Sequence, residues 1–259
     1  MKTVTAARYL TPLREGGSLP AIIEADDGEL YVMKFVGAGQ GRKALIAELV
    51  AGALGQTLGL PVPDVVIIEL DPALGPSEPD PEIHDLLRFS IGLNLGARFL
   101  PHAFAYNPLL PPHPSPELAS AIVWFDAYLT NVDRTPRNTN ILISQGKLWL
   151  IDHGACLYFH HDWKNYMERS RTPFPQIKDH TLLRFAGQLD QADATLKPRL
   201  TDAVLRAVID LIPEVWLVNE PTFTDPAEHR AAYVAYLTSR RAASPVFVEE
   251  AKNAQAQLV

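Results

Sequence analysis

Alternating apolar and polar side chains at the start of the chain predict a small β-sheet. Residues 20–25 and 30–36 are expected to form two strands joined by Asp26-Asp27-Gly28, a turn sequence typical of hairpins. Residues 65–70 are apolar and β-branched and predict a third strand. Residues 89–103 predict a fourth strand that runs into a connector. Strands are therefore concentrated in the first part of the chain.

Apolar positions at helical spacing take over further along the chain. Residues 43–58 predict a helix that ends at Gly59, and residues 116–131 predict a long, largely apolar helix. From Asp179 onward the pattern is helical nearly to the end. The proline-rich segment 107–116 between these regions is expected to be irregular.

This order of elements predicts an α+β fold with two lobes. We expect a small β-rich N-lobe at residues 1–100 and a larger helical C-lobe at residues 101–259. The length of 259 residues, of which 47% are apolar, is sufficient for a substantial core.

Charge and cysteine content exclude several classes of protein. The formal net charge is -7 and no run of Lys and Arg occurs, which argues against nucleic acid as a partner. No stretch is apolar enough to span a membrane, so stable membrane insertion is not expected. The single cysteine, Cys156, cannot form an internal disulfide, which is typical of a reducing compartment. We therefore expect a cytoplasmic protein.

A lysine and a glutamate stand out in the N-terminal region. Lys34 lies inside an apolar strand, where a charge is costly unless it reaches solvent or an anion. Glu48 lies on the following helix, and its neighbours one turn away, Ala44, Leu45 and Ala51, are apolar. The pattern therefore predicts an inward-facing Glu48 that pairs with Lys34, although a solvent-facing position is possible for each side chain alone.

The segment 131–154 brings further carboxylate and amide groups. Asp133 follows the end of the long helix, and Asn138 and Asn140 precede a short apolar hairpin. A two-residue turn at Gln145-Gly146 would pair Ile143 with Leu148 and Thr139 with Asp152. Antiparallel neighbours lie about 5 Å apart. Asp152 is therefore expected beside the two asparagines, as ligands suited to Mg²⁺.

Taken singly, each of these residues has a simpler interpretation. Asp133 and the asparagines could serve ordinary turn chemistry, and Gly16-Gly17-Ser18 could be a plain turn rather than a cover for phosphates. Asp126, inside the apolar helix, is expected to be a hydrogen-bonded structural carboxylate.

Together, the motifs GGSLP, YVMK, NVDRTPRNTNILI and IDHGACLYFHH resemble the HipA-like kinases, atypical kinases related in fold to the phosphatidylinositol 3- and 4-kinases. The resemblance covers most of the chain. It implies a bilobal protein-kinase-like fold that uses ATP and Mg²⁺. Lys34 would contact the ATP phosphates, with Glu48 as its partner and Asp133 as the catalytic aspartate. Asn138 and Asp152 would be Mg²⁺ ligands, with Asn140 as an assistant or alternative.

The resemblance also implies a nucleotide site and leaves the acceptor open. Gly16, Gly17 and Ser18 would lie near the phosphates, and the connector with Gly96, Arg98 and Phe99 would receive adenine. The chain departs from typical protein kinases, because Asn131-Val132-Asp133 replaces His-Arg-Asp and His153 follows Asp152 in place of Phe. It is also too short for the N-terminal module of the HipA toxins, so their toxin role is not expected.

The expected function is ATP-dependent phosphoryl transfer to a hydroxyl acceptor, with a protein Ser/Thr first and a small molecule or lipid as alternatives. Any partner protein is left open. A pseudokinase that binds ATP without turnover would keep the same residues. A third alternative is an NAD-linked oxidoreductase, because Gly37-Ala-Gly-Gln-Gly41 between a strand and a helix imitates a dinucleotide motif. That motif lacks its last glycine, since position 42 is Arg.

Overall fold

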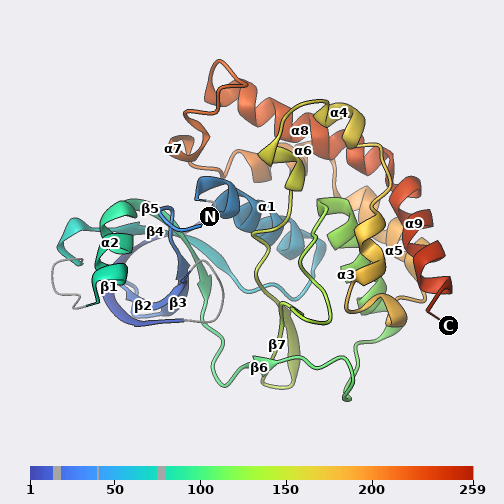
Figure 1. Cartoon of the computed structure of the whole chain (residues 1–259), viewed down its shortest axis with the longest axis horizontal. Coiled ribbons are helices and arrows are strands. Elements are labelled where there is room, and N and C mark those ends of the chain that lie inside the picture. Colours follow the sequence, from blue (N-terminus) through green and yellow to red (C-terminus); the bar gives the residue numbers. More distant parts are fainter. Residues whose placement is uncertain (14–18, 40, 75–79, 259) are drawn as a thin grey trace.

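A computed structural model describes residues 1–13, 19–39, 41–74 and 80–258. The first part of the chain forms a closed barrel with the strand order β1-β2-β3-β5-β4, seen at one end of the molecule in Figure 1. Its strands are β1 (Thr3–Pro12), β2 (Ala21–Ala25), β3 (Leu30–Lys34), β4 (Val65–Leu70) and β5 (Gly92–Arg98).

The hairpin of β2 and β3 confirms the first two predicted strands. Ile22 lies opposite Val32, and the buried and half-buried side chains alternate along both strands. Gly28 closes the turn with φ at 79°, a left-handed value that glycine adopts without strain. The second strand ends at Lys34, two residues earlier than predicted.

The barrel also contains a strand that the sequence pattern did not predict. β1 pairs with β2 in antiparallel fashion and with β4 in parallel, which closes the barrel. Its register shifts between Ala6 and Arg8 and again between Tyr9 and Thr11. These irregularities break the period-two pattern by which a strand is recognised in a sequence.

The barrel topology excludes a dinucleotide-binding unit. In such a unit, the strands on either side of the first helix are part of a parallel sheet. Here β3 pairs with β2 and β5, and both pairings are antiparallel. β4, which follows the helix, does not pair with β3 but lies between β5 and β1 in the barrel. The alternative of an NAD-linked oxidoreductase, drawn from residues 37–41, is therefore wrong.

Two helices are attached to the barrel region. The predicted helix is confirmed as α1 (Arg42–Leu58), and Gly59 ends it with φ at 76°. α2 (Pro81–Phe89) was not predicted, and it ends at Phe89, where the fourth strand was expected to start; that strand, β5, begins only at Gly92. Asp80 caps α2 by accepting a hydrogen bond from the Glu82 amide at 3.0 Å.

The rest of the chain is largely helical, as predicted. A small sheet of order β6-β7-β8 lies beside the helices (Figure 1). The strands are β6 (Phe104–Ala105), β7 (Ile141–Ser144) and β8 (Lys147–Leu150). The α-helices are α3 (Pro116–Leu129), α4 (Tyr166–Arg169), α5 (Leu189–Leu196), α6 (Asp202–Ile209), α7 (Glu214–Leu217), α8 (Pro226–Ala242) and α9 (Ser244–Ala256). Single 3₁₀ turns are Pro72–Leu74, Tyr158–His161, Pro175–Asp179, Leu183–Phe185 and Lys197–Arg199.

Buried apolar side chains form two clusters. The smaller cluster fills the barrel and includes Ile23, Met33 and Ile68. The larger cluster joins α1 to the helices of the C-terminal part and includes Leu49 and Phe125. Helix α1 therefore packs between the helical region and the outer side of the barrel, where Ile67 and Leu95 belong to the same cluster. The division into lobes at residue 100 stays a prediction.

Candidate functional site

The candidate site lies where the end of β3 meets α1 and the segment after β8. Lys34, the last residue of β3, extends its ammonium group between two carboxylates. One is Glu48 of α1, with which it forms an ion pair, and the other is Asp152, whose Oδ1 lies 2.6 Å from Lys34 Nζ. The predicted pairing of Lys34 with Glu48 is therefore present, and Asp152 joins the pair.

Glu48 is buried, as its apolar neighbours predicted, and is 7% exposed. His153 Nδ1 lies 3.8 Å from its second carboxylate oxygen. Gly154 comes close as well, since a Cβ atom at this position would lie 3.5 Å from Glu48 Oε1. The His-Gly pair that replaces Phe-Gly after Asp152 thus packs directly against the Glu48 carboxylate.

The charges of this cluster stabilise one another. Burial alone would lower the pKa of Lys34, but Glu48 and Asp152 raise it above its ordinary value. Burial would raise the pKa of Glu48, but Lys34 and then His153 hold it well below its usual range. Both groups consequently stay charged at neutral pH, and the ammonium is available to an anion such as a phosphate.

Asp133 lies in a second cluster, with both predicted asparagines. Asn138 Nδ2 donates to Asp133 Oδ2 at 2.8 Å, and Asn140 Nδ2 donates to the same oxygen at 3.2 Å. The Asp133 amide in turn donates to Asn131 Oδ1 at 3.1 Å. With both amide nitrogens engaged on Asp133, the amide oxygens of Asn138 and Asn140 are left as acceptors.

The hairpin that links the two clusters follows the predicted register. Ile143 pairs with Leu148 and Ile141 with Leu150, but the ladder ends there and does not include Thr139 and Asp152. Asn140 and Asp152 have left-handed φ values of 48° and 53°, which extended strands do not allow. Non-glycine residues in this conformation store strain and cluster at functional sites.

The side-chain oxygens of these two clusters are of the chemical kind that a divalent cation of the Mg²⁺ type accepts. Such an ion takes one or two protein carboxylates, neutral oxygens and substrate phosphates rather than a full protein cage. Asp152 offers a carboxylate, and Asn138 and Asn140 offer amide oxygens. The described residues contain no cluster of three or more His, Cys, Asp or Glu side chains that could hold a metal ion.

A buried polar network fixes the loop that carries Asp133. Asp126 of α3 is fully buried and accepts hydrogen bonds from Arg134 Nε at 2.6 Å, His180 Nε2 at 2.9 Å and Asn131 Nδ2 at 2.9 Å. Asp126 is therefore the structural carboxylate that its place in an apolar helix predicted. Burial would raise its pKa, but Arg134 and His180 hold the pKa well below the usual range.

The same arginine connects the two clusters of the site. Arg134 Nη1 donates to the carbonyl oxygens of Asn140 and, at 3.4 Å, Ile151. Asn140 belongs to the Asp133 cluster, and Ile151 directly precedes Asp152. Arg134 thus holds the backbone on both sides of the hairpin from a position that is 1% exposed.

His180 completes the network as a neutral imidazole. Its Nδ1 accepts a hydrogen bond from the Leu182 amide at 3.0 Å, so the proton resides on Nε2, which donates to Asp126. Burial lowers its pKa below the ordinary value, although Asp126 acts in the opposite direction. Sequence reasoning missed Arg134 and His180. The available signal was Asp126, because a carboxylate inside an apolar helix requires buried donors.

Residues predicted to bind nucleotide are only partly described. Gly16, Gly17 and Ser18 lie outside the described residues. Gly96, in β5, is buried, and a Cβ atom there would overlap the Ile68 side chain, which gives this glycine a packing role. Arg98 forms an ion pair with Glu29 at 2.7 Å, and the Phe99 amide donates to the Leu30 carbonyl at 2.9 Å. Contact of these residues with adenine stays a prediction.

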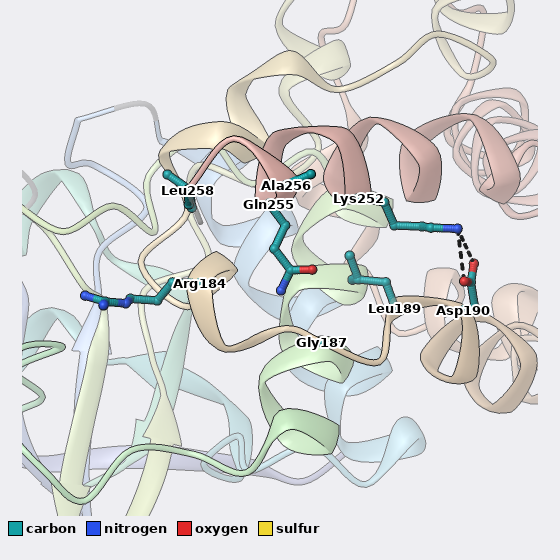
Figure 2. Close-up of a pocket in the computed structure, with 8 residues that line it drawn as sticks. All are labelled: Arg184, Gly187, Leu189, Asp190, Lys252, Gln255, Ala256 and Leu258. Carbon is teal, nitrogen blue, oxygen red and sulfur yellow. Dashed lines mark hydrogen bonds and ion pairs between the residues drawn. The ribbon is translucent and has the colours of Figure 1, made fainter.

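A cavity of about 390 Å³ lies elsewhere, between α5 and α9 (Figure 2). Lys252 and Asp190 form an ion pair at one end of it, at 3.0 Å, and Arg184 extends from the other end. None of the site residues lines this cavity, whose lining residues are Arg184, Gly187, Leu189, Asp190, Lys252, Gln255, Ala256 and Leu258. It is therefore separate from the candidate site. Within the described residues, no helix has the length and apolar character needed to cross a membrane.

Solved structures with a similar fold include two kinases. The Helicobacter pylori proinflammatory kinase CtkA gives a TM-score of 0.58 at 14% identity, over 99% of this chain and 98% of that chain. The Golgi casein kinase with Mn/ADP bound gives a TM-score of 0.50 at 12% identity, over 100% of this chain and 75% of that chain. Among curated proteins, no sequence matches.

At these identities the structural likeness concerns the fold alone, whereas a sequence profile carries the family assignment. The profile of the HipA-like kinases matches residues 7–250, nearly the whole chain. The motifs around Lys34, Asp133 and Asp152 lie inside that match. The resemblance drawn from those motifs is confirmed: this chain belongs to the HipA-like kinase family.

Proposed function

We propose that the protein transfers the γ-phosphoryl group of ATP to a hydroxyl acceptor, with Ser or Thr side chains of proteins as the acceptor class. The observation that carries the proposal is the position of Lys34, which comes from the barrel and meets Glu48 and Asp152 from the other side of the site. A charged lysine held by two carboxylates is ready to receive phosphate oxygens.

The residues of the site divide the chemistry among them. Lys34 binds the phosphates and offsets their charge, and Glu48 keeps the ammonium in place. Asp152 and Asn138 would hold Mg²⁺, with Asn140 beside them, and a bound Mg²⁺ supplies positive charge to the phosphoryl oxygens. That the Golgi casein kinase was crystallised with Mn/ADP supports use of a nucleotide with a divalent cation here.

Asp133 is the group that orients the acceptor. One of its carboxylate oxygens receives both asparagine amides, and the other is left to face a hydroxyl. In the reaction, the acceptor oxygen forms a bond to the γ-phosphorus, and the bond from that phosphorus to the β,γ-bridging oxygen of ATP breaks. The hydroxyl proton passes to Asp133, and ADP leaves.

Two measurements test the proposal. A thermal-shift titration should show stabilisation by ATP with Mg²⁺ and none by NAD. A turnover assay with ATP, Mg²⁺ and a Ser/Thr-containing protein acceptor should show phosphoryl transfer that is lost in Asp133→Ala. Stabilisation without turnover would point instead to a pseudokinase, and absence of both would refute the kinase assignment for this site.

A further inference from the structure

Helix α1, which carries Glu48, begins with charges that oppose its own dipole. Its first residues are Arg42 and Lys43, and its first turn holds no acidic residue. Gly41, at the N-cap position, has no side chain to accept a hydrogen bond from the first amides. The N-terminal end of a helix is electropositive, so two cations there are unfavourable. The helix therefore depends on groups from outside itself.

The segment that follows α7 supplies those groups. Glu220 Oε2 lies 3.0 Å from Lys43 Nζ, and the Glu220 side chain is 12% exposed. The carbonyl of Val218 accepts a hydrogen bond from Arg42 Nη1 at 3.3 Å. From α7 itself, Trp216 Nε1 donates to the carbonyl of Leu93 in β5 at 3.1 Å. One short segment of the helical region thus contacts both α1 and the barrel.

The C-terminal end of α1 is held from the helical region as well. The last four carbonyl groups of an α-helix have no partner within the helix. The turn at Gly59 satisfies two of them, through Gly59 N to Gln56 O at 3.0 Å and Leu60 N to Gly55 O at 2.9 Å. Arg199 satisfies the other two, because its Nη1 donates to Leu58 O at 2.6 Å and its Nη2 to Thr57 O at 2.8 Å.

The packing of α1 agrees with these end contacts. Its buried apolar residues belong to the larger cluster, which joins the helical region to the outer side of the barrel at Ile67 and Leu95, and not to the barrel interior. Figure 1 shows α1 running between the barrel and the C-terminal helices, with α6 and α7 beside it. Through its end contacts, the helix that carries Glu48 is tied to the region that carries Asp152, His153 and Asp133.

We infer that Arg199 and Glu220 are positioning residues for phosphoryl transfer, an inference that rests on the function proposed above. They act through α1, which they fix at its two ends so that Glu48 stays beside Asp152 and His153. The lysine site is thereby preassembled on the helical region, and, among the described residues, Lys34 alone of its ion-pair cluster comes from the barrel.

Substitutions at both ends of α1 test this inference. Arg199→Ala should raise KM for ATP and lower kcat/KM by about 10- to 100-fold, since small misplacements of binding groups have effects of this size. Arg199→Lys, which retains one donor group, should recover part of the loss. Glu220→Lys should have a similar effect, and the double variant Lys43→Glu with Glu220→Lys should restore KM by re-forming the pair in the opposite sense.

Arg230→Ala is the matched control, because Arg230, on α8, also donates to a backbone carbonyl, but that carbonyl belongs to Ile212 and not to α1. It should leave KM for ATP unchanged at temperatures well below the melting temperature. If Arg199→Ala and Glu220→Lys lower the melting temperature without changing KM, or if the charge-swapped pair fails to recover it, the two residues serve stability alone and the inference is wrong.

Hydrogen exchange separates a failure of this inference from a failure of the proposed function. Amides of residues 45–49 should exchange faster in Arg199→Ala and Glu220→Lys than in wild type, without ATP, while α9 amides should not. If wild type shows no Mg²⁺-dependent turnover but exchange in α1 responds in this way, Arg199 and Glu220 do fix α1 and the kinase proposal fails. If exchange in α1 is unchanged in both variants, Arg199 and Glu220 do not fix α1 and the inference is wrong.

Discussion

The barrel and the helical region are built on different kinds of interaction. Within the described residues of β1–β5, the buried side chains are apolar except for Asn94, and no charged one is buried. In contrast, α1 and the helical region bury Glu48, Asp126, Arg134 and Arg240. Apolar burial is non-directional, whereas buried charges require partners in defined geometry.

This difference matches what each region brings to the site. The barrel contributes Lys34, a long side chain that tolerates small shifts of its strand. The helical region contributes Asp133, Asn138 and Asp152, whose backbone is fixed through Arg134. In the proposed mechanism, the groups that align the reacting atoms therefore lie on a hydrogen-bonded network, and the lysine that binds phosphate lies on an apolar barrel.

The largest effect on activity is expected at Asp133, in the loop that the buried network of the helical region holds. Asp133→Asn removes the carboxylate that is proposed to accept the hydroxyl proton, and kcat should fall by about 10²–10⁴-fold. Phosphoryl transfer from ATP with Mg²⁺ measures this loss, and the melting temperature should stay close to that of wild type because Asp133 is only half-buried. Retained turnover would remove Asp133 from the mechanism.

Breaking the buried pair should cost the most stability. Arg134→Met leaves Asp126 charged and without its cation, which destabilises a fold by about 3–5 kcal/mol. Chemical denaturation measures this change. The double variant Asp126→Leu with Arg134→Met should recover much of the stability but not the activity, because Asn140 and Ile151 lose the same donor in both cases. Equal losses in the single and double variants would contradict this account.

Lowering the pH should reduce the difference in melting temperature between wild type and Arg134→Met. The pKa of Asp126 is depressed in the folded wild type, so its contribution to stability is present above about pH 4 and is lost as the pH falls through the folded pKa. Without Arg134, burial raises the pKa of Asp126. Protonation of Asp126 at low pH then removes the cost of a buried, unpaired carboxylate in the variant. Melting temperatures measured from neutral pH down to about pH 4 should therefore converge.

The barrel's contribution is tested at Lys34. Lys34→Met should lower kcat/KM for ATP by about 10²–10³-fold, the usual effect of removing one stabilising charge. It should also destabilise the fold, because Glu48 is left buried without its main partner. Adding Glu48→Gln should restore stability and leave activity low. A recovery of both would mean that Lys34 does not contact phosphate.

Packing inside the barrel should respond more weakly. Gly96→Ala places a methyl group against Ile68, and the resulting overpacking should cost about 1–3 kcal/mol. Gly187→Ala is the matched control, because nothing lies within 4 Å of its added Cβ atom. Unfolding in urea measures both, and a change in KM for ATP well below the melting temperature in Gly96→Ala would place the nucleotide close to this strand.

The smallest effect is expected at the surface of the barrel. Arg98 and Glu29 are about half exposed, so Arg98→Ala should change stability by about 0–1 kcal/mol. Isothermal titration with ATP and Mg²⁺ decides whether Arg98 has a second role at the connector. An affinity equal to that of wild type would exclude the predicted contact with nucleotide.

Regular elements were predictable where local pattern and tertiary packing agree. The β2–β3 hairpin and α1 show the expected periodicity of apolar side chains. Glycine marks the turn of this hairpin at Gly28, the end of α1 at Gly59 and the turn of the β7–β8 hairpin at Gly146. β1 was missed because its register is irregular and few of its side chains are buried, and its pairing depends on the distant strand β4. α2 was missed because its proline-flanked start reads as a continuing loop.

In the candidate site, single residues were predictable and most of their connections were not. Lys34 and Glu48 are recognisable in the sequence as charged residues among apolar neighbours, and this is sufficient to predict that they pair. Arg134 follows Asp133 in a polar, proline-broken loop, a setting in which arginine is usually exposed. Only the tertiary structure shows that the loop folds over Asp126. The left-handed backbone of Asn140 and Asp152 likewise comes from that folded loop and has no local signature.

The contact of Lys34 with Asp152 has a consequence for the order in which ligands bind. If Asp152 holds Mg²⁺, the metal has to compete with an ammonium group that already lies 2.6 Å from one of its oxygens. Phosphate oxygens relieve the competition, because they give Lys34 a new anionic partner and share the metal. Nucleotide and metal should therefore bind with positive thermodynamic coupling, each raising the affinity for the other.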